Sequence, residues 1–130
     1  MHFIFLSVLL LAPLFSSAVR ENPLFDVYDT KISIAEENAR LDNYAVQIKN
    51  STGGRGLIVV YSESDHNAPA VKARARRAVK YLVKTRGVDP AKVVMRYDAA
   101  CGYNHILLYL FFENQADPPP DTKCSRFGRR

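Results

Sequence analysis

The chain is poor in the residues on which most enzyme and metal sites depend. Its 130 residues include no tryptophan, two cysteines and three histidines. It also lacks the Gly-x-Ser-x-Gly turn of serine hydrolases, the His-Glu-x-x-His helix of zinc proteases and a glycine-rich phosphate loop. The polar groups that remain near one another follow no catalytic pattern: Ser62, Glu63, Ser64, Asp65, His66 and His105. We therefore expect a protein that is not an enzyme, with no catalytic residue, no cofactor and no metal site.

Charge is missing from the start of the chain. Residues 1–18 contain no Lys, Arg, Asp or Glu, and the apolar run at 3–15 has the length of a signal-peptide core. A membrane-spanning helix needs about 20 apolar residues, more than this run supplies. Ser16 and Ala18 give the small-x-small pattern of a cleavage site, so we expect a signal peptide that ends at Ala18 and a periplasmic or secreted product without a transmembrane span. The alternative is an uncleaved membrane anchor.

Both cysteines, Cys101 and Cys124, follow this expected export signal. An even number of cysteines in an oxidising compartment makes a disulfide between them possible, and two unpaired thiols are the alternative. Neither has a second Cys or His at the spacing of metal ligands.

The remaining chain alternates between strand-like and helix-like patterns. The expected strands lie at 24–28, 57–61, 93–97 and 106–112. Ser33 and Glu36 have the spacing of a capping box for a first helix, and Asn67 is the expected cap of a second helix that ends near Arg86, before Gly87. The inward positions of the first helix would be Ala35, Leu41, Tyr44, Ala45 and Ile48, and Glu37 would lie off that face.

This order predicts an α/β fold of the α+β sandwich type, β-α-β-α-β-β, with a mixed sheet covered by two helices. Segment 57–61 is the expected central strand, because it is apolar throughout. The short last connection predicts an antiparallel hairpin of 93–97 with 106–112. We expect one domain at 19–116, followed by a proline-rich basic tail at 117–130.

Basic residues outnumber acidic ones by 18 to 13, and the excess gathers on the second helix. No acidic residue interrupts its seven cations: Lys72, Arg74, Arg76, Arg77, Lys80, Lys84 and Arg86. Like charges four residues apart on a helix repel by a few tenths of a kcal/mol per pair. The pattern is typical of an anion-binding face at Arg76, Arg77, Lys80 and Lys84, or of a merely solvated helix flank.

Residues 24–112 resemble the OmpA-like C-terminal domain, an envelope module shared by outer-membrane protein A, peptidoglycan-associated lipoprotein and flagellar motor protein B. The matching residues are Arg74-Ala75, Ala78, Tyr81-Leu82, Gly87-Val88 and Lys92. Small exported relatives also share the segments Leu41-Asp42-Asn43-Tyr44-Ala45 and Tyr81-Leu82-Val83-Lys84-Thr85-Arg86-Gly87. The resemblance implies the fold expected above and a non-catalytic role in the cell envelope.

Ligand-binding members of that family hold a peptidoglycan stem peptide between an arginine and an aspartate. The resemblance places Arg74 in the arginine position and offers Asp65 for the aspartate, in a Ser-Glu-Ser-Asp-His turn that replaces the family's Gly-His-Thr-Asp. The expected partner is then peptidoglycan or another anionic envelope component, with no specific nucleic acid. The alternative is an exported basic interaction domain with a degenerate ligand site, which binds an anionic polymer or a protein through the second helix.

Overall fold

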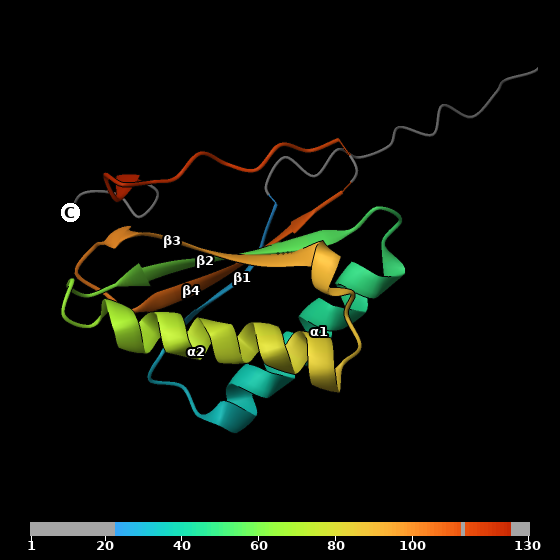
Figure 1. Cartoon of the computed structure of the whole chain (residues 1–130), viewed down its shortest axis with the longest axis horizontal. Coiled ribbons are helices and arrows are strands. Elements are labelled where there is room, and N and C mark those ends of the chain that lie inside the picture. Colours follow the sequence, from blue (N-terminus) through green and yellow to red (C-terminus); the bar gives the residue numbers. More distant parts are fainter. Residues whose placement is uncertain (1–22, 113, 126–130) are drawn as a thin grey trace, which may run out of the picture.

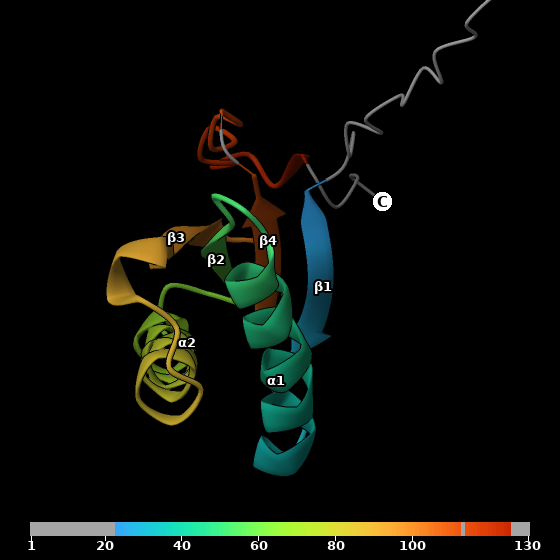
Figure 2. The same ribbon diagram turned by 90° about the vertical axis from the view of Figure 1, so that its right-hand side faces the viewer.

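Four strands form one mixed sheet, and two helices cover one of its faces (Figures 1 and 2). The computed structural model describes residues 23–112 and 114–125, so the expected signal segment 1–18 and the last five residues lie outside the described part. The elements follow the order β1 (Leu24–Asp29), α1 (Ile34–Asn50), β2 (Arg55–Ser62), α2 (Ala68–Lys80), β3 (Val93–Ala100) and β4 (His105–Phe111). The expected α+β class, with a mixed sheet and two helices packed on it, is confirmed.

The strand order in the sheet is β1-β4-β2-β3. β2 pairs in parallel with β3, and β4 pairs antiparallel with both β1 and β2. The expected central position of segment 57–61 is confirmed. The expected hairpin is wrong, because β4 crosses past the end of β2 and is inserted between β1 and β2. This placement gives β4, buried from Ile106 to Phe111, a neighbour on each side.

α1 begins where the sequence indicates, with the Ser33 hydroxyl accepting a hydrogen bond from the backbone N–H of Glu36 at 3.1 Å. Its buried face contains Leu41, Tyr44, Ala45 and Ile48, as expected. Two assignments on this helix are wrong: Ala35 is exposed, and Glu37 is fully buried. Glu37 precedes Leu41 by four residues and Tyr44 by seven, and side chains at these spacings share one helix face.

α2 continues through a π-helical turn, Tyr81–Thr85, to the expected end of the second helix. Gly87 follows with a φ of +69°, the left-handed conformation that favours glycine after a helix. Asn67 occupies the N-cap position, but its side chain makes no capping bond and instead accepts a hydrogen bond from the Ser64 hydroxyl at 2.6 Å. The expected cap is therefore wrong in its chemistry.

The face of the sheet opposite the helices carries a second apolar cluster, formed by Leu57, Val59, Tyr61, Leu107, Tyr109 and Phe111. Residues 114–125, here called the C-terminal strap, run along this side of the sheet (Figure 1). A disulfide between Cys101 and Cys124 ties the far end of the strap to the residue that follows β3. The expected disulfide is thus present.

Polar contacts hold the strap between its two ends. Arg55 donates to the backbone oxygen of Gln115 at 2.6 Å and pairs with Asp117. Arg96 donates to the backbone oxygen of Pro118 at 2.7 Å, and the buried Asp98 carboxylate accepts from the N–H of Asp121 at 3.0 Å. None of the helices in the described ranges has the length and apolar character required to span a bilayer.

Candidate functional site

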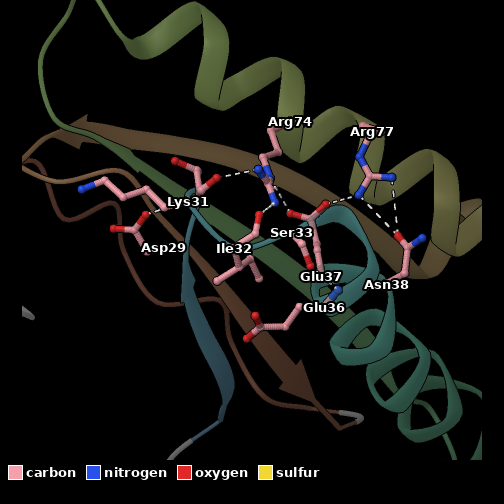
Figure 3. A network of polar contacts seen from close by, with 10 residues as sticks. Asp29, Lys31, Ile32, Ser33, Glu36, Glu37, Asn38, Arg74 and Arg77 are labelled. Atoms are coloured by element: carbon pink, nitrogen blue, oxygen red, sulfur yellow. Dashed lines mark hydrogen bonds and ion pairs between the residues drawn. The ribbon is translucent and has the colours of Figure 1, made fainter.

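A fully buried carboxylate, that of Glu37, lies between α1 and α2 (Figure 3). The Nε of Arg74 lies 2.7 Å from Oε2 of Glu37, and Arg77 pairs with Oε1. Burial and the adjacent Glu37 carboxylate raise the pKa of Tyr28 far above its usual range. Two arginines from α2 therefore neutralise one acid from α1, and the neighbouring phenol remains protonated.

Arg74 also binds the loop that connects β1 to α1. Its two terminal nitrogens donate to the backbone oxygens of Thr30 at 2.5 Å and Ile32 at 2.8 Å. All three guanidinium nitrogens thus have partners within the chain, and Figure 3 shows the side chain extending from α2 toward this loop. The arrangement makes Arg74 a clamp that joins three segments of the fold.

Arg74 forms its ion pair with Glu37 rather than with Asp65, the residue that the family resemblance offers as its counterpart. Asp65 is exposed in the turn between β2 and α2, and its carboxylate makes no ion pair within the described part of the chain. Arg74 does line a small open hollow of about 230 Å³, whose other walls are Thr30, Asn67, Ala70, Val71 and Asn104. The hollow offers amide and hydroxyl groups, but its arginine is already bound to a carboxylate.

A second bridge between the helices is centred on Asp42. Its carboxylate accepts from the Tyr81 hydroxyl at 2.6 Å and from Arg86 Nε at 2.5 Å. The Tyr81 hydroxyl first, and then Arg86, lower the pKa of Asp42 below its usual value. The carboxylates of α1 therefore pair with three cations that face α1: Arg74 and Arg77 from α2, and Arg86 directly after the π turn.

The cations on the outer side of α2 have no such counterpart. Lys72, Arg76, Lys80 and Lys84, here called the outer row, follow one another at intervals of four residues. Arg76, Lys80 and Lys84 are exposed, and none of the four pairs with a carboxylate of residues 23–112 or 114–125. The ammonium of the half-buried Lys72 instead lies 4.3 Å from the centroid of the Tyr97 ring.

The structure divides the four cations of the expected anion-binding face. Arg77 belongs to the Glu37 network, where it also contacts Asn38, whereas Arg76, Lys80 and Lys84 remain open to solvent. A shallow hollow of about 290 Å³ lies beside them, lined by Arg77, Lys80, Tyr81, Lys84 and Thr85. The surface can therefore offer several unneutralised positive charges to an anion.

Sequence reasoning missed Glu37, the acid that decides which cations are neutralised. Its spacing to Leu41 and Tyr44 could have identified it as a buried position. Within the described residues, no group of three or more His, Cys, Asp or Glu side chains could hold a metal ion. Comparisons of the chain with protein-family models, curated proteins and solved structures found no match.

Proposed function

We propose that this protein is an exported, non-catalytic binding module whose outer row on α2 binds an anionic partner. One observation carries the proposal: Glu37 and Asp42 of α1 pair with Arg74, Arg77 and Arg86, while the outer row has no carboxylate partner in the described chain. A net charge of +5 adds a long-range attraction for anions.

The outer row destabilises its own helix. Adjacent members stand at i,i+4 spacing, where like charges destabilise a helix by about 0.2–0.5 kcal/mol per pair. A single acidic residue in the row would replace repulsion with attraction. A role in binding provides a reason for four cations to remain together at this cost.

The chemistry of the row supports binding rather than catalysis. A lysine that acts as a nucleophile or a base usually lies in a desolvated pocket. Lys80 and Lys84 are instead exposed to solvent. The Cys101–Cys124 disulfide supports a periplasmic or secreted location, since disulfides persist in oxidising compartments.

Peptidoglycan is a second candidate partner, favoured by the hollow beside Arg74. In the OmpA-like family, the arginine at this position binds the stem peptide, and Arg74 retains guanidinium protons beyond those used by its three internal contacts. Asn67 and Asn104 would supply the other polar groups around such a ligand.

Two variants with the same net charge test the main proposal. R76Q/K80Q/K84Q removes three charges from the outer row, and K31Q/K92Q/K123Q removes three exposed lysines from elsewhere. We expect the row variant to elute from an anionic column at clearly lower salt than the control variant. Identical elution of the two variants would show that net charge alone governs retention and would reject the proposal.

A sacculus pull-down separates the second candidate from the first. Binding in the Arg74 hollow should persist in R76Q/K80Q/K84Q and should be competed by free diaminopimelate. Binding through the outer row should be lost in that variant and should not be competed by diaminopimelate. Its affinity should fall steeply as the salt concentration rises.

A further inference from the structure

Resting on the proposed function, we infer that the partner is a linear polyanion without aromatic bases, which lies lengthwise along α2. The class includes phosphodiester polymers and acidic polysaccharides, whose shared chemistry is an anionic group on each repeating unit. Three features lead to this choice: the shape of the outer row, the state of its neighbouring rings and the absence of large apolar groups from the exposed surface of α2.

The row is long and narrow. At a rise of about 1.5 Å per residue, the eight steps from Lys72 to Lys80 along α2 extend over about 12 Å, with about 6 Å between successive members, and Lys84 follows in the π turn. A small anion could contact one or two of these charges, whereas a chain with regularly repeated charges could contact all four. The gain from such simultaneous contacts is the effect of multivalency.

The aromatic rings beside the row are already engaged. The ring of Tyr97 lies against Lys72, and its hydroxyl is 2.8 Å from that of Ser62. Tyr81 donates to Asp42 and carries Arg86 over its ring at 5.6 Å. Proteins that bind single-stranded nucleic acid stack the bases on available aromatic side chains. Neither ring is free for this role, which favours a polymer without bases.

The surface of α2 also lacks the groups that anchor a protein in a lipid bilayer. The large apolar side chains exposed in the described structure are Val27, Ile34, Val46 and Val94, and none belongs to α2 or its π turn. Val71, Ala75 and Ala78 of α2 are buried against the sheet, and its exposed apolar residues, Pro69, Ala70 and Ala73, are small. Stable binding at a membrane surface combines positive charge with inserted apolar groups, and this helix offers only the charge.

The experiment measures affinity against polymer length at low salt. Two series are used, oligomers of glycerol phosphate and oligomers of galacturonate, to learn which anion the row prefers. We expect affinity to rise steeply until the oligomer spans the row and to change little beyond that length. For the longest oligomer, R76Q/K80Q/K84Q should lose about tenfold or more in affinity, and K31Q/K92Q/K123Q about threefold or less.

The salt dependence provides an independent readout on the same samples. Each anion contacted on a polymer adds about 0.7–0.9 to the slope of log affinity against log salt, so removing three row cations should reduce the slope by about 2. A length-independent affinity in both series would overturn the inference. So would tighter binding to single-stranded DNA, to vesicles containing an anionic lipid or to an acidic peptide of equal charge.

The two proposals fail differently. Column retention that depends on the row, together with length-independent binding, would reject the polymer and leave the anion-binding function standing. Retention that ignores the row would reject both.

Discussion

At the scale of single residues, Glu37 is the acid on which the junction of the two helices depends. Its carboxylate compensates Arg74 and Arg77, and Arg74 in turn binds the backbone of the β1–α1 loop. A buried ion pair often adds little net stability, but removing one partner leaves the other charge without compensation. The network should therefore affect the free energy of unfolding most when one of its partners is removed.

Replacing Glu37 with glutamine should destabilise the fold by about 2–3 kcal/mol, measured as the free energy of unfolding in urea. The figure lies below that of a wholly buried pair, since the side chains of Arg74 and Arg77 are 19% and 35% exposed and water can partly compensate them. The control is Glu36→Gln, whose exposed carboxylate pairs with Arg40 one turn along and should change stability by about 0.5 kcal/mol or less. Equal effects of the two substitutions would contradict this account.

The sequence indicates the positions of the arginines but not their partner. Arg74 is singled out by a family resemblance, and the same resemblance suggests Asp65, which is far less buried than the acid that actually binds it. A charged residue is normally expected on the solvent side of a helix, so the sequence predicts that position for Glu37 although its spacing fits the buried face. Only the approach of α2 to α1 shows that two guanidinium groups make its burial tolerable.

At the scale of elements, the two long sides of α2 differ in character. One side is apolar and buried, with Val71, Ala75 and Ala78 against the sheet, and the other carries the outer row. Substitutions in the row should therefore change stability and binding in opposite directions.

Lys80→Glu tests this opposition. The new carboxylate would stand four residues from both Arg76 and Lys84, turning two repulsive pairs into attractive ones. We expect the free energy of unfolding to rise by about 1 kcal/mol at low salt, and by less at high salt. Affinity for an anionic polymer should fall in the same protein. Lys92→Glu makes the same charge change away from α2. It should raise the free energy of unfolding less and lower the affinity for the polymer less than Lys80→Glu.

The strand pattern predicts the existence of the elements better than their pairing. The short connection to the preceding strand predicts a hairpin for residues 106–112. Their apolar character was the better guide, since β4 occupies an interior position and β3, with Arg96 and the exposed Val94, lies at the margin of the sheet. A short connection fixes the direction of the next strand but does not decide its neighbour.

At the scale of the whole molecule, the two faces of the sheet are covered in different ways. Two helices cover one face, while the C-terminal strap and its disulfide lie along the other. Composition suggests an extended tail beyond residue 116, and nothing local indicates that this segment binds Arg55, Arg96 and Asp98. Those contacts join positions too distant in the sequence for local patterns to reveal.

The disulfide should stabilise the molecule chiefly by lowering the conformational entropy of the unfolded chain. It joins residues separated by 23 positions, a loop for which chain entropy gives about 3 kcal/mol. We expect C101S/C124S to lose about that amount in urea unfolding. Amide exchange should accelerate in the strap and at the end of β3, while α1 and α2 keep their protection. Unchanged stability, or loss of protection throughout the protein, would contradict this view of the strap.

The position of β4 also affects when the protein can fold. The segment between β1 and β2 in the sheet is the last strand to be synthesised, so the two earlier strands have no partner to join them until residue 111 has emerged. Contacts between distant parts of a chain form late and slowly. Until then β2 can pair only with β3, and β1 has no neighbouring strand, so completion of the sheet is coupled to the emergence of β4.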